Sequence, residues 1–220
     1  LRFLCLHGAG TNSDVDSTNS EFTDPISEEL RKDNSAVFHF IDGEEDSGPG
    51  PGIEGLFEGP YFSFYAWPRT CTTEDEKAVE EAYKLIYAAI EQEGPFDGIL
   101  GFSQGATLAF QFLSQHAKRF PYDPPNAVFR CGVFICGPPP FRVISGQLVC
   151  DEDLGKIRIP SLHIVGKEDE ILEHSLHLFE LCEGDCATLL HHGKGHTIPR
   201  DKENVMAIAK AIRELSYRAV

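Results

Sequence analysis

One serine, Ser103, lies between two glycines in the stretch GFSQG of residues 101–105. The apolar run before it, residues 96–102, predicts a buried strand, and the apolar residues after it recur at helical spacing over 106–113. A G-x-S-x-G sequence at a strand-to-helix turn is typical of a nucleophile elbow, which exposes the serine hydroxyl on a strained turn. The simpler interpretation is that Ser103 only caps the helix. Finding a general base and an acid elsewhere in the chain would favour the nucleophile elbow over the helix cap.

An acid candidate follows Ser103 in the chain order Ser, Asp or Glu, His that an α/β-hydrolase requires. Asp169 comes a few residues after the predicted strand 161–165, in a loop before a helix. Glu168 and Glu170 are its rivals. All three could instead be acidic residues that stabilise the amino end of a helix through its dipole. Loop position favours Asp169 as the acid.

Five of the nine histidines follow the acid candidate: His174, His177, His191, His192 and His196. The first two fall within a predicted helix, and the next two end a predicted strand. His196 lies in the loop GKGHTIP, residues 193–199, before the final helix, and a general base must reach the nucleophile from such a loop. We therefore predict a catalytic triad of Ser103, Asp169 and His196.

An oxyanion hole needs two backbone N–H groups, one from the residue after the nucleophile and one from the loop after an early strand. Gln104 follows the predicted nucleophile. The stretch HGAG, residues 7–10, follows the first predicted strand, and Ala9 is our candidate for the second donor, with Gly8 as the alternative. A plain glycine-rich turn would explain Gly10 equally well.

These residues need a scaffold, and the sequence alternates strand and helix patterns. The predicted strands are 1–6, 36–41, 96–102, 127–136, 161–165 and 187–191, and the predicted helices besides the elbow helix are 24–32, 74–92, 173–182 and 201–217. This alternation predicts a mostly parallel, doubly wound sheet with helices on both faces, in one α/β-hydrolase domain over residues 1–220. Active sites of such sheets lie at the carboxyl ends of the strands, where all the candidate residues fall.

Two long connections, residues 42–73 and 137–155, interrupt this alternation and are predicted to be irregular, cap-like loops near the site. The first is rich in aromatic residues. Tyr61, Phe62 and Trp67 are our candidates for binding an apolar acyl group, because ligand pockets are mostly apolar with few polar groups.

Composition excludes several partners. With 19 basic and 35 acidic residues the formal net charge is −16, which would repel nucleic acid and anionic membranes. The seven cysteines are scattered and several lie in apolar runs, which favours a reducing, cytoplasmic location. Cys182 and Cys186 lack a second ligand pair at zinc spacing, so no metal site is predicted. The triad chemistry needs no cofactor.

Four stretches together resemble the FSH family of fungal serine hydrolases: LRFLCLHGAGTNSD at the start, PGPGIEGLFEGPYFSFY at 49–65, ILGFSQGA at 99–106 and HHGKGHTIPR at 191–200. The family includes carboxylesterases and small thioesterases that release polyketides from synthase carrier domains, such as the one in the lovastatin pathway. The resemblance implies an α/β-hydrolase fold with Ser103 as nucleophile, Asp169 as acid and His196 as base. The polar stretch 11–24 leaves the start of the first helix open.

We therefore expect a serine hydrolase that cleaves acyl thioesters or esters through an acyl-enzyme, with a polyketide on a carrier domain as one substrate. The alternatives are a general carboxylesterase on small esters and a non-catalytic ligand-binding module with a hydrolase-like pocket. Because carrier domains are commonly acidic, docking would need a local basic patch, for which Arg69, Arg142 and Lys194 are candidates.

Overall fold

The structure is a computed structural model that describes residues 1–13, 24–51, 53–54, 59–67, 69, 72–145, 147–150 and 154–219. The stretch 14–23, where the start of the first helix was left open, lies outside these residues. The first described helix is α2 (Asp24–Arg31).

A six-stranded sheet forms the centre of the molecule, in the order β10-β9-β6-β5-β1-β2. Its strands are β1 (Arg2–Leu6), β2 (Val37–Ile41), β5 (Gly98–Phe102), β6 (Cys131–Ile135), β9 (Ser161–Gly166) and β10 (Ala187–His192). Every neighbouring pair is parallel, which confirms the predicted parallel sheet. β6 is shorter than the predicted 127–136, because a turn in which Ala127 N–H donates to the Pro124 carbonyl precedes it.

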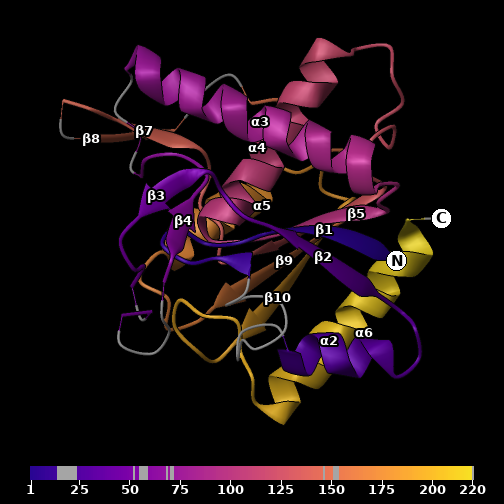
Figure 1. Ribbon diagram of the computed structural model, residues 1–220. Coiled ribbons are helices and arrows are strands. Elements are labelled where there is room, and N and C mark those ends of the chain that lie inside the picture. Colours follow the sequence, from indigo (N-terminus) through magenta and orange to yellow (C-terminus); the bar gives the residue numbers. More distant parts are fainter. Residues whose placement is uncertain are drawn as a thin grey trace.

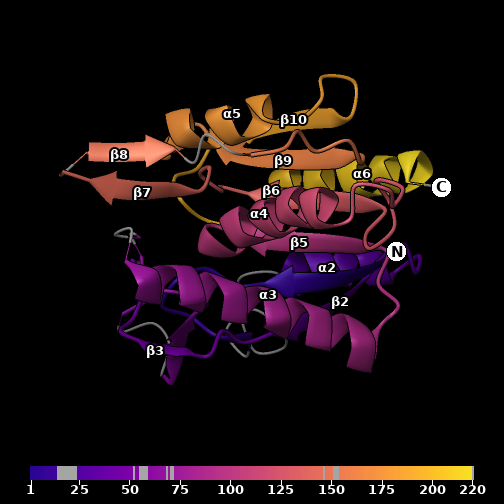
Figure 2. The same cartoon turned by 90° about the horizontal axis from the view of Figure 1, so that it is seen from above.

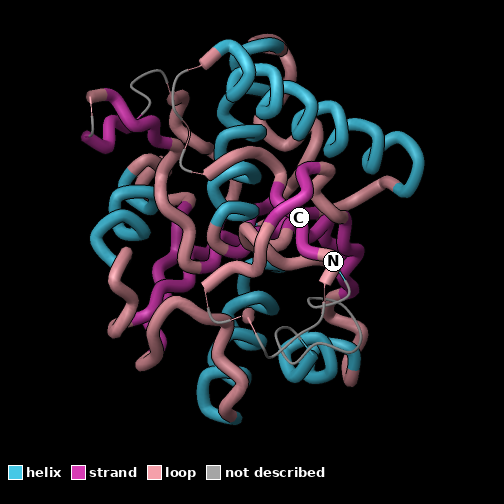
Figure 3. The backbone as a smooth tube through the Cα atoms, turned by 60° about the vertical axis from the view of Figure 1, so that its left-hand side comes forward, coloured by secondary structure: helices cyan, strands magenta, loops and turns pink. Residues whose placement is uncertain are grey.

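Helices cover both faces of this sheet, as Figures 1 and 3 show. Leu4 and Ile99 pack on one face with α3 (Thr73–Glu93), α4 (Gln104–Arg119) and α5 (Leu172–Glu180). Phe3 and Leu100 point to the other face and pack with α2 and α6 (Lys202–Arg218). Successive strand residues thus alternate between two cores, which is why these strands read as continuous apolar runs.

The two long connections differ from their prediction as irregular loops, because each contains an antiparallel hairpin. β3 (Glu45–Ser47) pairs with β4 (Tyr61–Ser63), and β7 (Phe141–Ile144) pairs with β8 (Gln147–Cys150). At the ends of these strands Ile144 pairs with Gln147, and Ser145, directly after β7, has φ 51°. The sequence signal was the dipeptide Ser145-Gly146, which is typical of a turn.

In Figure 2 the arrows of the main sheet point toward the side of β3, β7 and β8. These hairpins therefore lie at the carboxyl ends of the strands, where parallel sheets place their sites. Among the described residues, no helix is long and apolar enough to cross a membrane.

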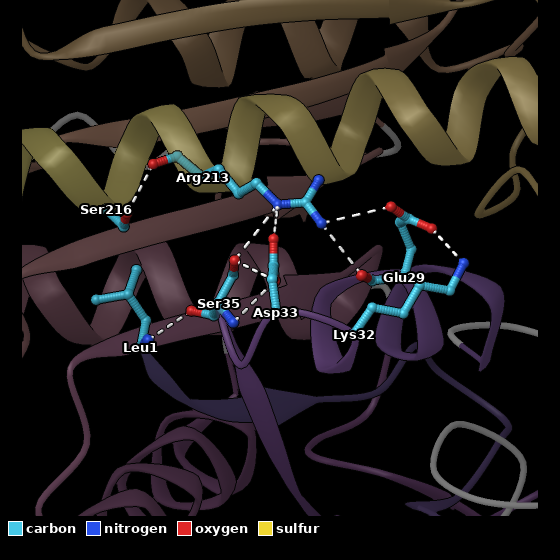
Figure 4. A network of polar contacts seen from close by, with 7 residues as sticks. All are labelled: Leu1, Glu29, Lys32, Asp33, Ser35, Arg213 and Ser216. Carbon is cyan, nitrogen blue, oxygen red and sulfur yellow. Dashed lines mark hydrogen bonds and ion pairs between the residues drawn. The ribbon is translucent and has the colours of Figure 1, made fainter.

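On the face of α2 and α6, a polar network holds the two helices together (Figure 4). Arg213 on α6 donates from Nε to Asp33 Oδ2 at 2.7 Å and from Nη2 to the Glu29 carbonyl at 3.1 Å. Asp33 and Glu29 belong to α2 and the turn after it, so this guanidinium joins two segments far apart in the sequence.

Candidate active site

Strand β5 runs into helix α4 through Ser103, whose backbone has φ 52° and ψ −116°. A Cβ at Gly101 would lie 2.3 Å from the Gly105 carbonyl, and a Cβ at Gly105 would lie 2.2 Å from the Leu6 oxygen. Both glycines are therefore required for the close approach of strand and helix. The Ser103 side chain makes no capping hydrogen bond, so the simpler interpretation of this serine as a helix cap is wrong.

The Ser103 hydroxyl is instead one end of a chain of three side chains. Its Oγ lies 2.9 Å from His196 Nε2, and His196 Nδ1 lies 2.9 Å from Asp169 Oδ2. Because an ionised carboxylate only accepts, Nδ1 carries the imidazole proton, and Nε2 is then free to accept from the serine hydroxyl. The structure thus brings together three residues from three separate loops, each at the carboxyl end of a strand.

Burial separates Asp169 from its two rivals. Its side chain is 1% exposed, whereas Glu168 and Glu170 are exposed to solvent. Its second oxygen, Oδ1, accepts the Ile171 N–H at 2.9 Å, so both carboxylate oxygens have partners. The carboxylate is therefore held in one orientation toward the imidazole.

Two residues that the sequence reasoning did not select lie behind this carboxylate. Cys136, with φ 49° at the end of β6, has its Sγ within 4.8 Å of ligand atoms of Asp169 and His196. Burial, reinforced by the negative charge of Asp169, raises the pKa of the Cys136 thiol to about 12, so the thiol stays protonated beside the acid. The His192 Nε2 lies 3.8 Å from the Cys136 Sγ, and burial lowers the pKa of His192.

The loop after β1 is held by His7. Gly43 N–H donates to His7 Nε2 at 2.9 Å, so the other nitrogen, Nδ1, carries the proton and donates to the Gly8 carbonyl at 2.6 Å. Burial lowers the pKa of His7 and keeps it neutral, as this pair of bonds requires. No protein acceptor among the described residues takes the N–H of Ala9 or of Gln104, and their role as oxyanion donors stays a prediction.

A cavity of about 310 Å³ adjoins the Ala9 loop. Trp67 lines it, as does Tyr65, which the sequence reasoning did not select. Of the residues described, neither Tyr61 nor Phe62 is part of its lining, although both were predicted to bind substrate. The backbone of Phe62 pairs instead with that of Thr11.

The predicted basic patch is largely neutralised. Arg69 is 2% exposed and its Nη2 lies 3.0 Å from Glu76 Oε1, so it cannot present its charge to a partner protein. Arg142 lies 3.1 Å from the same carboxylate oxygen. Of the three candidates, Lys194 alone is exposed and does not form an ion pair with Glu76. Sequence position could not reveal that one carboxylate on α3 binds both arginines.

Residues 1–208 match the family model described as serine hydrolase (FSH1). A relative named hydrolase phiM from Talaromyces stipitatus is 37% identical, covering 99% of this chain and 88% of the relative. Esterase FPY3 from Fusarium mangiferae is 35% identical, covering 100% and 99%.

Solved structures share the fold. Maize acyl-protein thioesterase 2 matches with a TM-score of 0.62 and 16% identity, covering 97% of this chain and 93% of that one. The Bacillus cereus carboxylesterase matches with a TM-score of 0.59 and 18% identity, covering 97% and 87%. These similarities confirm the α/β-hydrolase fold predicted from the alternation of strands and helices.

Proposed function

Because this chain belongs to the FSH1 serine hydrolase family, we propose that it cleaves acyl esters or thioesters through an acyl-enzyme formed on Ser103. The observation that carries the proposal is the hydrogen-bond chain from Ser103 through His196 to Asp169, with both distances 2.9 Å. Nucleophile, base and acid are each within hydrogen-bonding distance of the next, as covalent acyl transfer requires.

In the first half of the reaction, His196 Nε2 takes the hydroxyl proton as the Ser103 Oγ attacks the carbonyl carbon. Asp169 holds the imidazole in the required tautomer and stabilises the imidazolium. The negative charge that develops on the carbonyl oxygen faces the N–H groups of Ala9 and Gln104 and the positive end of the α4 dipole. The tetrahedral intermediate then expels the alcohol or thiol, which receives the proton from His196.

In the second half, a water molecule gives a proton to His196 and attacks the acyl carbon. The ester bond to Ser103 breaks, its Oγ recovers the proton, and the carboxylic acid leaves. No redox step occurs and no group other than water is consumed. The cavity beside Ala9, with Tyr65 and Trp67 in its lining, would hold the acyl group during both halves.

Replacing Ser103 by Ala tests this function. We expect hydrolysis of p-nitrophenyl esters to fall to background, because the attacking oxygen is gone, while circular dichroism and the Tm stay close to those of the wild type. A fluorophosphonate probe should label the wild type and leave the variant unlabelled. Labelling of both proteins, or of neither, would contradict an activated Ser103, and the latter result would favour a ligand-binding module.

A carrier-bound polyketide thioester is a candidate substrate on narrower grounds, namely the resemblance to family members that release such chains and the presence of Tyr65 and Trp67 in the lining of the cavity. The experiment compares kcat/KM for an N-acetylcysteamine thioester and an oxyester with the same acyl group. A preference for the thioester supports the candidate, and a preference for the oxyester favours a general carboxylesterase. If a carrier domain docks by charge, Lys194→Glu should lower turnover of the carrier-bound form alone.

A further inference from the structure

The side chain of Gln104 forms two hydrogen bonds that the proposed chemistry does not use. It is 1% exposed and belongs to the first turn of α4, directly after Ser103. Its Oε1 accepts the Phe64 N–H at 2.9 Å, and its Nε2 donates to the Tyr65 carbonyl at 2.8 Å. A glutamine amide has a donor and an acceptor side by side, so it can bind two successive backbone groups of one segment. This side chain thereby fastens the segment 62–65 to the elbow.

The other end of the segment 62–65 is fastened to the Ala9 loop. The Phe62 carbonyl accepts the Gly10 N–H at 2.9 Å, and the Phe62 N–H donates to the Thr11 carbonyl at 2.7 Å. Gly10 N–H also lies 3.2 Å from the Ser63 Oγ. Between the two ends, the Phe64 ring stacks on the His7 ring with centroids 4.6 Å apart. Since His7 binds the Gly8 carbonyl, this contact adds a further hold on the same loop.

We propose that the Gln104 side chain is a positioning residue that sets the separation of the two oxyanion donors. The Gln104 N–H and the Ala9 N–H come from elements more than ninety positions apart in the chain. The segment 62–65 bridges these elements by hydrogen bonds at both ends. This inference rests on the proposed function, because it assumes that both N–H groups bind the same oxygen.

The bridge also links the acyl cavity to the reacting carbonyl. Tyr65, whose carbonyl Gln104 binds, lines the cavity together with Ala9 and Trp67. Loosening the segment 62–65 would therefore affect the donors and the cavity wall together. Weaker binding by the donors lowers kcat, because the oxyanion forms only after the substrate has bound. A looser cavity wall mainly raises KM.

The test is Gln104→Met, which keeps the backbone N–H and nearly the same volume but removes both side-chain hydrogen bonds. We expect kcat for a p-nitrophenyl ester to fall about 10- to 100-fold, the range for a misplaced catalytic group. KM should rise as well, but by a smaller factor than kcat falls, because the cavity wall loosens with the segment whereas ground-state binding does not use the oxyanion donors. An acyl trifluoromethyl ketone, which forms a tetrahedral oxyanion on the serine, should lose affinity by the same factor as kcat/KM.

Gln111→Met is the matched control. Gln111 lies on the same helix, is 4% exposed and has a side-chain Oε1 without a hydrogen-bond partner among the described residues. Its replacement should leave kcat unchanged. Ser63→Ala, at the other end of the bridge, should give a smaller loss of kcat in the same direction, because Gly10 N–H keeps its bond to the Phe62 carbonyl.

Three results would overturn the proposal. In the first, Gln104→Met is folded by circular dichroism and keeps kcat within about threefold of the wild type. In the second, Gln111→Met loses as much activity as Gln104→Met, which would make the loss a general effect on α4. In the third, the carboxylic acid product loses affinity as much as the trifluoromethyl ketone does. Ser103→Ala tests the proposed function separately, so an inactive Ser103→Ala with a fully active Gln104→Met would reject only the positioning role.

Discussion

At the scale of single residues, the acid Asp169 shows how burial shapes the site. Its side chain is 1% exposed, while His196, its partner, is 28% exposed and borders solvent. An imidazolium that forms beside such a carboxylate is stabilised in a medium of lower dielectric than water, where the attraction is stronger. The protonated Cys136 thiol behind the carboxylate adds no competing charge. The hydrogen bond to Nδ1 also fixes the tautomer that leaves Nε2 free for Ser103.

Asp169→Asn should therefore lower kcat by roughly 10⁴-fold, because an amide in this position favours the wrong imidazole tautomer. Steady-state kinetics on a p-nitrophenyl ester measure the loss. Glu168→Gln and Glu170→Gln are the controls, and both should stay near wild-type activity because their carboxylates are exposed. A mild effect of Asp169→Asn together with a severe effect at either glutamate would move the acid to that position.

Much of the residue-level site could be predicted because its signals are local. G-x-S-x-G at a strand-to-helix junction pointed to Ser103, and chain order with loop position selected Asp169 and His196. The Gln104 side-chain bonds to the segment 62–65 and the burial of Arg69 against Glu76 could not be predicted, because they depend on how distant loops pack. The position of a residue in the sequence shows which loop it occupies. It does not show which residue from a distant part of the chain it will contact.

At the scale of elements, the sheet and the helices on its faces followed from periodicity, while the hairpins did not. β3 and β4 are three residues each, too short for a pattern of alternation to stand out. The contacts between elements were also hidden. Arg213 illustrates this. It binds Asp33, which lies about 180 positions earlier in the chain, and neither stretch of sequence indicates that the two segments are in contact.

Arg213→Met should lower the Tm by a few degrees without changing kcat, because the network of Figure 4 lies on the face of α2 and α6, away from Ser103. The Met side chain keeps the apolar stem and removes only the guanidinium. The Asp33 carboxylate is exposed, so salt should screen its ion pair with Arg213, and the difference in Tm from the wild type should shrink toward ~0.5 M NaCl. Thermal unfolding at low and high salt measures this. A difference that does not depend on salt would show that the neutral hydrogen bonds dominate.

At the scale of the whole molecule, the free energy of unfolding should fall as the solution becomes acidic. Several buried histidines are neutral in the folded chain, and burial lowers the pKa of His163 to about 3 from its ordinary value of 6.5. Between those values the unfolded chain binds a proton at His163 and the folded chain does not. Stability therefore rises with pH in this window, by about 1.4 kcal/mol per pH unit for His163.

His163→Gln should reduce that slope by about 1.4 kcal/mol per pH unit, the equivalent of one bound proton, between roughly pH 4 and 5.5, and by about half as much at pH 6.5. Urea unfolding at several pH values gives the slope for each protein. The variant will be less stable at neutral pH, because the His163 ring packs against Phe134 and Phe179, so the comparison is of slopes rather than of absolute values. Identical slopes would show that His163 is not the source of the acid sensitivity.

Selection for stability and selection for activity act in opposite directions at position 103. Ser103 has φ 52°, a backbone conformation that glycine adopts without steric strain and other residues rarely adopt. Holding a serine there lowers the free energy of unfolding by on the order of 1–3 kcal/mol. A duplicated copy of this gene that no longer needed its chemistry would gain stability from Ser103→Gly, with no other change in the elbow. Pseudoenzymes descended from this fold are therefore expected to carry G-x-G-x-G at the elbow, as a mark of activity lost while the scaffold was kept.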